Sequence, residues 1–429
     1  MVPLDDAVNF VLERCWPLTP GPVRTADAVG LVLAGDVVAT DPVPPFASTA
    51  MDGYAVRAAD TADAPVTLPV VAEVAAGHPA ERPLGPGEAM RIFTGAPVPD
   101  GADAVVMVER TERLDDGRSV RIDVCVEQGN HLRAAGEDLA AGERVFGSGD
   151  EVTPARLGVL ASLGVHEVVA HPRPRVGVMS TGDELVTGTE PLRPGQIRDS
   201  NRPTLLALVA QAGFEPVDLG WVPDDEDAIT AAIERGAGSC DAVMSSGGVS
   251  MGDIDLVRVV LDRIGDMRWM QVAIRPAKPL AFGVVMGPEG TPIPVFGLPG
   301  NPVSSMVSFA LFARPGLRRL AGHPEERLHL PRLPAVAGER LARRPDGKLH
   351  FVRVVAGVDP GDGALRVWSS GGQGSHQLGA MARADGLAVL PDGDGVAAGE
   401  PVQVILLGEP ARLIGSPVSG PRGEAAALG

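Results

Sequence analysis

Basic residues are scarce in this 429-residue chain, which has 37 Lys and Arg against 55 Asp and Glu and a formal net charge of −18. Nucleic acids and anionic membrane surfaces bind through a basic footprint, so this balance argues against both as non-specific partners. Lysine is the scarcest cation, because only Lys278 and Lys348 occur and arginine supplies the rest. An anionic ligand would therefore need a local basic pocket. Each lysine either marks a place that requires a compact ammonium or is a surface residue without such a role.

Cysteine and paired histidine are also rare. Cys15, Cys125 and Cys240 are far apart and form no CxxC pair, which argues against a cysteine-based zinc site and a disulfide framework. The eight histidines show no HxH or HxxxH spacing, which argues against a histidine-based metal centre. No apolar run approaches the roughly 18 residues of a membrane-spanning helix, and the acidic N-terminal segment does not resemble a secretory signal. These features predict a cytoplasmic protein.

The pattern of apolar and turn-forming residues changes along the chain. The length predicts about three domains. Short β-branched runs between Gly and Pro turns at 46–140 are typical of a β-rich module. Strands alternate with helices at 173–325, which predicts a mainly parallel sheet with helices on both faces. Short strands return after residue 331, which predicts a small β-barrel or sandwich, and the Gly/Pro/Ala-rich segment 409–429 is expected to be disordered.

Individual elements follow from periodicity and turn residues. Helices are expected at 4–15 and 154–164, outside the α/β segment. Within that segment we expect strands at 176–180, 217–221, 241–245, 269–274, 279–285 and 293–297, and helices at 202–212, 226–236, 254–264 and from about Pro302.

Four loops follow strands of this segment and are polar or glycine-rich: 181–185, 224–227, 246–255 and 299–302. Ligands of open α/β sheets bind at the carboxyl ends of the strands, where the strand order reverses. The third and fourth loops precede helix starts, where backbone N–H groups and the helix dipole can hold an anion, and Asn301 is the expected N-cap of the last helix. No loop has the GK[ST] of a Walker motif. Each loop alone can be a structural turn, but together they indicate a ligand with more than one phosphate-like group.

Charged side chains accompany these loops. Glu184, Asp224 and Asp255 would meet at the same edge of the sheet, where carboxylate oxygens beside phosphates usually hold Mg²⁺. The acidic run 224–227 can equally cap a helix. Arg275 and Lys278 lie three residues apart between prolines and supply the basic spot that an oxyanion would need, although a solvated turn is the competing interpretation.

A series of motifs in a fixed order carries a family resemblance. The chain resembles the molybdopterin molybdenumtransferases, the family of the bacterial MoeA proteins and the E domain of gephyrin, over about residues 1–408. The motifs are STAMDGYAVR (48–57), RIFTGAPVP (91–99), GED (136–138), STGDEL (180–185), DSNRP (199–203), SSGGVSMGDID (245–255), RPAKP (275–279), GLPGNPVS (297–304) and GSH (374–376).

The resemblance implies an α/β multidomain fold whose central, mainly parallel α/β domain binds molybdopterin. It also implies a homodimer with a cleft between the α/β domain of one subunit and the first two segments of its partner. The expected parts are an elongated, discontinuous N-terminal domain (1–45 and 141–172), a β-rich inserted domain (46–140), the α/β domain (173–325), a C-terminal β-barrel (326–408) and the tail (409–429).

The resemblance further implies an enzyme that takes adenylylated molybdopterin and molybdate, cleaves the phosphoanhydride, releases AMP and leaves molybdenum on the dithiolene, with Mg²⁺ assisting. The dithiolene is itself a soft ligand, so the shortage of protein thiolates fits this chemistry. The resemblance also implies two possible kinds of protein partner, a molybdopterin adenylyltransferase and proteins of molybdoenzyme maturation.

Site residues come from the same resemblance. Molybdate would contact Arg275, Lys278, Ser250, Arg353 and Ser375, next to Pro279. The pterin and phosphates would lie over Gly247, Gly248, Ser250, Pro299, Gly300, Asn301 and Ser304. The catalytic set would be Glu184, Asp224 and Asp255, which would hold Mg²⁺ or nucleotide, with Asp52, Thr94 and Asp138 from the partner subunit.

Two alternatives and one departure stay open at this point. The chain could be a molybdopterin adenylyltransferase, which would leave roughly 250 residues unexplained, or a molybdopterin-binding scaffold without catalysis. The family usually has Lys-Pro-Gly-Lys-Pro where this chain has Arg-Pro-Ala-Lys-Pro. Ala277 would then restrict the backbone where glycine permits a positive φ, which could change the affinity for the oxyanion.

Overall fold

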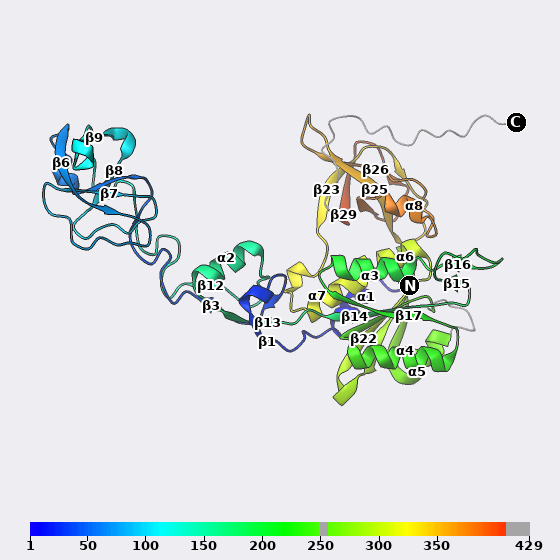
Figure 1. Cartoon of the computed structure of the whole chain (residues 1–429). Coiled ribbons are helices and arrows are strands. Elements are labelled where there is room, and N and C mark those ends of the chain that lie inside the picture. The colour runs from blue at the N-terminus through cyan, green and yellow to red at the C-terminus, as the bar shows by residue number, and fades with distance from the viewer. Residues whose placement is uncertain (249–255, 409–429) are drawn as a thin grey trace. The chain divides into compact units, whose positions relative to one another are not determined.

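The computed structural model describes residues 1–248 and 256–408 (Figure 1). The chain separates into two compact units. The larger unit comprises Met1–Gly21, Gly30–Val32 and the chain from Ala170 onward, and the smaller unit comprises Pro22–Val29 and Leu33–Val169. No helix in the described ranges is both long and apolar enough to cross a membrane.

The central sheet of the larger unit has the strand order β17-β14-β18-β22-β21-β19. The first four strands are parallel, and β21 and β19 are antiparallel to their neighbours. The order reverses at β14, which has β17 on one side and β18 on the other, so a ligand crevice is expected at the carboxyl ends of β14 and β18. The strands are β14 (Arg175–Thr181), β17 (Glu215–Val222), β18 (Ala242–Ser246), β19 (Gly265–Gln271), β21 (Pro279–Met286) and β22 (Pro292–Leu298).

Helices cover both faces of this sheet, as Figure 1 shows. Successive residues of a strand belong to two different hydrophobic cores. Val178 packs in the core with α1 and α3, whereas Met179 packs in the core with α4 and α5. This alternation buries both faces, as expected for a parallel sheet between helices. The helices are α1 (Leu4–Leu12), α3 (Asn201–Gln211), α4 (Glu226–Ser239), α5 (Leu256–Ile264), α6 (Pro302–Ser308) and α7 (Arg314–Leu320).

Two predicted elements differ from the structure. The strand expected at 269–274 is instead β19, which begins at Gly265 and exposes Asp266 and Arg268, so its apolar residues were a poor guide to its limits. The helix from Pro302 is interrupted by a π-helical turn, η6 (Phe309–Ala313), between α6 and α7. Pro315 lies just beyond this turn and has no N–H with which to continue an α-helical bond pattern.

A closed five-stranded β-barrel follows within the described residues. Strand β25 pairs with both β26 and β27, β29 pairs with both β27 and β23, and β23 pairs with β26, which closes the circle around an aliphatic core. The short strand β20 (Ile274–Arg275) adds to β25. The multidomain α/β fold with a C-terminal barrel is thus confirmed. The barrel elements are β23 (Arg332–Ala337), β25 (Leu349–Val358), β26 (Leu365–Ser369), α8 (Leu378–Ala382), β27 (Gly386–Leu390) and β29 (Pro401–Leu406).

The smaller unit is mostly β-structure. Its main sheet has the order β8-β5-β7-β6-β10-β9, and the helix α2 (Pro154–Ser162) begins where Thr153 accepts a hydrogen bond from the Arg156 N–H. Chain segments before and after this sheet pair as β3 (Val37–Val38) with β12 (Arg144–Phe146), so the sheet lies within an insertion. The sheet strands are β5 (Gly53–Val56), β6 (Val66–Val74), β7 (Ala89–Ile92), β8 (Ala104–Met107), β9 (Thr111–Leu114) and β10 (Ser119–Ile122).

The remaining strands are short. They are β1 (Gly21–Arg24), β2 (Val32–Leu33), β4 (Ser48–Thr49), β11 (Leu132–Arg133), β13 (Glu167–His171), β15 (Leu185–Val186), β16 (Ile197–Arg198), β24 (Leu341–Ala342) and β28 (Gly395–Val396).

Candidate functional site

The loops after β14, β18 and β22 meet at the carboxyl edge of the sheet. The Gly247 N–H donates to the Leu298 carbonyl at 3.1 Å, and a Cβ on Gly247 would lie 2.8 Å from the Thr181 carbonyl oxygen. A Cβ on Gly300 would lie 3.8 Å from the Gly247 Cα. Gly247 and Gly248 have φ angles of 99° and 70°, which favour glycine. The structure therefore brings two of the predicted loop glycines, Gly247 and Gly300, close together at this edge of the sheet.

Asn201, which was not among the predicted site residues, joins these loops. Its side-chain amide donates to Ser246 Oγ and to the Gly300 carbonyl, both at 2.7 Å. The DSNRP motif contains this residue, but an asparagine at a helix start is ordinarily interpreted as a cap. Only the fold shows that the amide spans two other loops.

The start of α6 is held by the barrel. Asn301 occupies the N-cap position, as predicted, and its side chain makes no capping hydrogen bond there. The Val303 N–H donates to the Ser375 carbonyl at 3.1 Å, so a carbonyl of the barrel loop, and not the Asn301 side chain, accepts from this N–H at the start of the helix. Ser375 of the barrel loop therefore lies beside the first turn of α6.

Arg353 is a buried cation on β25 without a carboxylate partner among the described residues. Its residue exposure is 0%, and its Nη2 donates to the carbonyls of Gly372 and Gly374 at 2.6 and 3.2 Å. Its Nε and Nη1 are buried and have no hydrogen-bond partner in the described part of the chain. Burial lowers the pKa of its guanidinium. Unpaired buried donors are costly, so the site favours an anion with several acceptor oxygens.

The loop with Arg275 and Lys278 joins the same barrel strand. Arg275 of β20 pairs with His350 of β25, and the Lys278 carbonyl accepts from the Val272 N–H at 2.7 Å. Both cationic side chains are exposed, and Pro279 begins β21. The backbone thus fixes this loop beside the strand that carries Arg353, and the basic spot stays a prediction.

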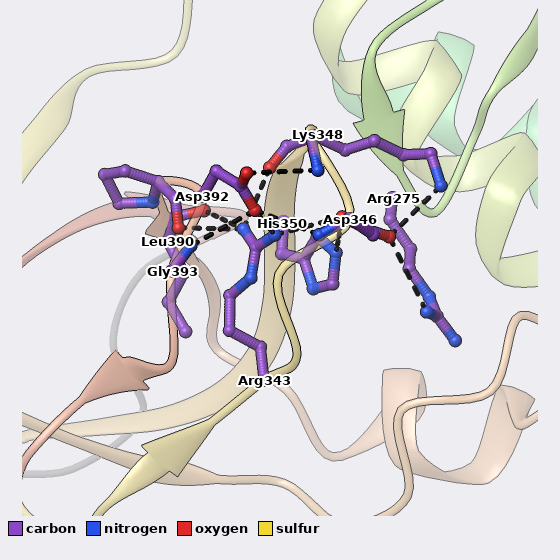
Figure 2. Close-up of polar contacts among 10 residues, drawn as sticks. Arg275, Arg343, Asp346, Lys348, His350, Leu390, Asp392 and Gly393 are labelled. Carbon is purple, nitrogen blue, oxygen red and sulfur yellow. Dashed lines mark hydrogen bonds and ion pairs between the residues drawn. The ribbon is translucent and has the colours of Figure 1, made fainter.

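The second lysine of the chain has a structural contact. Lys348 Nζ lies 3.1 Å from Asp346 Oδ2 (Figure 2). His350 Nε2 lies 3.0 Å from the other oxygen of this carboxylate, and Arg275 Nη1 lies 3.9 Å from Asp346 Oδ2. Burial alone would raise the pKa of Asp346, but hydrogen bonds from Lys348 and His350 outweigh it and lower this pKa to about 2. Asp346 is therefore ionised at neutral pH.

Arg343 completes this barrel network. Its side chain is 1% exposed, and it pairs with Asp346 at 3.0 Å and with Asp392 at 2.6 Å. It also donates to the carbonyls of Lys348, Leu390 and Pro391 (Figure 2). The network ties two barrel turns together next to Arg275.

Ala277 adopts the conformation that glycine would allow. Its φ is 70°, and the residue is 2% exposed. At a positive φ an alanine carries strain of about 1 kcal/mol, which glycine would relieve. Glycine also gives the unfolded chain more conformational freedom, which lowers the free energy of unfolding by about 0.5–1 kcal/mol. We therefore expect Ala277→Gly to leave the free energy of unfolding unchanged within about 0.5 kcal/mol, as measured by urea denaturation. A decrease in the free energy of unfolding of about 1 kcal/mol, as for an alanine-to-glycine change at an unstrained position, would show that Ala277 is not strained.

The acidic loop residues divide into two kinds. Asp225 Oδ1 accepts from the Ala228 N–H at 2.9 Å and caps α4, and Glu226 pairs with Arg263 at 3.0 Å. Asp224 and Glu184 are exposed beyond the ends of β17 and β14. Their loops are in contact, because the Asp224 N–H donates to Asp183 Oδ1 at 3.2 Å.

The metal site expected from Glu184, Asp224 and Asp255 stays a prediction. Asp255 and Ser250 lie outside the described residues. Within the described ranges, no three His, Cys, Asp or Glu side chains form a group that could hold a metal. The oxygen-only donors Glu184 and Asp224 nevertheless fit the chemistry of Mg²⁺, which retains several waters.

Asp52 and Thr94 are partners in the smaller unit. Asp52 Oδ1 accepts from the Thr94 N–H at 2.8 Å and from its hydroxyl at 2.9 Å. These two bonds, aided by Arg91, hold the pKa of Asp52 below its ordinary 3.8. Asp138 is exposed in the same unit, and its N–H donates to the Val43 carbonyl at 3.0 Å.

Thr94→Val is expected to raise the pKa of Asp52 while leaving it below 3.8, because the variant removes the hydroxyl but keeps the backbone donor. A carboxyl whose pKa is lowered by folding stabilises the folded state above its unfolded pKa, and this contribution is lost as the pH falls through the folded value. NMR titration of the Asp52 carboxyl measures the shift. Thr94→Ser retains the hydroxyl and should titrate as the wild type does; an unchanged pKa in Thr94→Val would refute the bond.

These features, a glycine-rich sheet edge and a buried arginine without a carboxylate partner in the described residues, are typical of a protein that binds a phosphorylated or oxyanionic small molecule. Residues 2–164 match the MoeA N-terminal region (domain I and II), residues 177–319 a probable molybdopterin binding domain, and residues 334–407 the MoeA C-terminal region (domain IV). The chain belongs to the family of the molybdopterin molybdenumtransferases, which are enzymes. The resemblance noted in the sequence is thereby confirmed.

Individual relatives agree along nearly the whole chain. Molybdopterin molybdenumtransferase 2 of Mycobacterium tuberculosis is 42% identical over 408 residues, which cover 92% of this chain and 96% of the relative. The molybdopterin molybdenumtransferase of Haemophilus influenzae is 36% identical and covers 94% and 98% of the two chains. The crystal structure of the molybdopterin biosynthesis moeA protein from Pyrococcus horikoshii superposes with a TM-score of 0.78 at 29% identity, covering 95% of this chain and 100% of that one.

Proposed function

We propose that this enzyme inserts molybdenum from molybdate into adenylylated molybdopterin, releasing AMP and forming the molybdenum cofactor. The observation that carries the proposal is Arg353, a buried guanidinium with two unpartnered nitrogens beside the loop of Ser375. Molybdate is a tetrahedral dianion that can accept from both nitrogens. Curated relatives named for this transfer, spanning nearly the whole chain, support the reaction over that of an adenylyltransferase.

The chain's own residues divide the work. Arg353, with Arg275 and Lys278 from the adjoining loop, binds and orients molybdate. Gly247, Gly248 and Gly300 let the pterin phosphate approach the backbone, and Asn201 holds these loops in place. When bound, Mg²⁺ would be held by Glu184 and Asp224 and would neutralise the phosphoanhydride. Water attacks the adenylyl phosphorus, the P–O bond to the pterin phosphate breaks, and AMP leaves with the new oxygen while molybdopterin keeps its own phosphate.

The proposal includes a homodimer. Asp52, Thr94 and Asp138 belong to the smaller unit, and we place them at the α/β site of a second subunit, as the family motifs imply. Their acidic and hydroxyl groups would line the nucleotide side of that site. The proposal also places the enzyme in the cytoplasm, supplied by a molybdopterin adenylyltransferase and serving molybdoenzyme maturation.

AMP release tests the function. Purified protein with adenylylated molybdopterin, Mg²⁺ and molybdate should release AMP and load molybdenum, and the rate should depend on molybdate. The same protein with ATP and molybdopterin should form no adenylylated product, which separates it from an adenylyltransferase. Nucleotide that persists bound without turnover would support a non-catalytic scaffold and overturn the proposal.

A further inference from the structure

Trp221 is an exposed aromatic residue at the edge of the site. It lies near the carboxyl end of the edge strand β17, opposite Ser180 of β14, and is 41% exposed. Its indole N–H donates to the Gly182 carbonyl at 2.9 Å. This bond orients the ring without burying it. Leaving a tryptophan partly exposed forgoes hydrophobic stabilisation, so a ligand that covers it would gain that contribution.

The neighbours of Trp221 are the loops that carry Glu184 and Asp224. The Asp224 N–H bonds to Asp183, and a Cβ on Gly182 would lie 2.6 Å from Glu184 Oε2, so the backbone there is closely packed. In the described part of the chain, no aromatic ring or cation stacks on the indole. An uncharged planar ring suits this acidic margin better than a bare phosphate does.

The strand order places Trp221 at one end of the carboxyl edge of the sheet. Gly300 follows β22 and Gly247 follows β18, and these glycines are where the proposed function places the phosphate. Beyond them come β14 and then β17 with Trp221. Neighbouring strands are about 4.8 Å apart, so the ends of β22 and β17 are separated by about 14 Å. A ligand whose pterin phosphate lies over the glycines would have its nucleoside at the β17 end.

We propose that Trp221 is a specificity-determining residue whose indole stacks on the adenine ring of the nucleotide. The inference rests on the proposed function, because adenine reaches the site as part of adenylylated molybdopterin. Stacking of a base on an aromatic side chain contributes about 1–3 kcal/mol. Trp221 would thereby favour an adenylylated substrate over molybdopterin without the nucleotide.

Calorimetric titration with AMP and Mg²⁺ tests the proposal directly. Trp221→Leu should raise the Kd for AMP about tenfold, while Trp221→Phe should change it by less than about threefold. Both variants lose the N–H that bonds to Gly182, so the difference between them isolates the aromatic ring. Trp16→Leu, at a tryptophan that is 51% exposed elsewhere in the larger unit, is the matched control and should bind AMP as the wild type does.

The contrary outcomes are distinct. Equal AMP affinity in the wild type and Trp221→Leu overturns the stacking role, even when wild-type turnover proceeds and the proposed function holds. Equal losses in Trp221→Leu and Trp221→Phe show that the bond to Gly182 matters and not the ring, which also overturns it. Unchanged AMP binding with weakened molybdopterin binding would place the pterin on Trp221 and refute adenine. Failure of wild-type AMP release would sink the proposed function itself.

Discussion

Arg353→Met is expected to reduce molybdate-dependent AMP release by at least about 100-fold while changing the free energy of unfolding by less than about 1 kcal/mol. Methionine fills much of the space of the arginine chain. The variant loses the bonds to Gly372 and Gly374 but no longer buries a charge without a carboxylate partner, and these effects offset each other. AMP release across a molybdate titration, with urea denaturation of the same samples, measures both quantities.

Arg353→Lys is the matched control for this result. It keeps a positive charge but lacks the planar set of donors, so it should bind molybdate more weakly than the wild type and more strongly than Arg353→Met. A large loss of stability with full activity in the folded fraction of Arg353→Met would contradict the assignment, because the arginine would then be a structural residue.

Arg343→Met is expected to destabilise the barrel by about 1–3 kcal/mol, because it removes a buried guanidinium that donates to three carbonyls and pairs with Asp346 and with the exposed Asp392. Amide hydrogen exchange in β25 reports the free energy of opening of this region. Lys348→Met removes a more exposed partner of Asp346, 21% exposed, and should cost less than about 1 kcal/mol. Equal effects of the two substitutions would refute the central role of Arg343.

Acidification should weaken the same network. The pKa of Asp346 is about 2 in the folded protein against an ordinary 3.8, so its contribution to stability is present above about pH 4 and disappears as the pH falls toward 2. Lys348→Met should show a smaller loss over this interval than the wild type does, because Lys348 is one of the two groups that lower the pKa of Asp346.

Much of the α/β segment is predictable because its strands are buried, apolar and separated by clear turns. The helix at 226–239 begins at its predicted start after an aspartate cap, and β22 (Pro292–Leu298) extends one residue beyond each end of the strand predicted at 293–297. The two-residue strands β15 and β16 carry no periodicity and could not be predicted. The limits of β19 were missed because its alternate residues face solvent.

The residues of the candidate site are predicted by the family motifs more than by periodicity, charge or residue spacing. Arg353 lies in an ordinary strand, and only closure of the barrel shows that its guanidinium is buried without a carboxylate. Asn201 has the local signature of a helix start, whereas its two bonds depend on loops 45 and 99 residues away. Contacts over such distances depend on strand order, which residue spacing does not encode.

The short strand β20 has a consequence for how the enzyme could be divided. It leaves the α/β segment to pair with β25, so Arg275 is anchored to the same barrel strand that carries Arg353. A fragment that stopped before the barrel would keep the glycine edge and Trp221 but would lose both Arg353 and the support of the cationic loop. Because Phe351, Leu387 and Val389 of the barrel belong to the same hydrophobic core as the α/β segment, such a truncation should impair folding as well as the binding of the metal oxyanion.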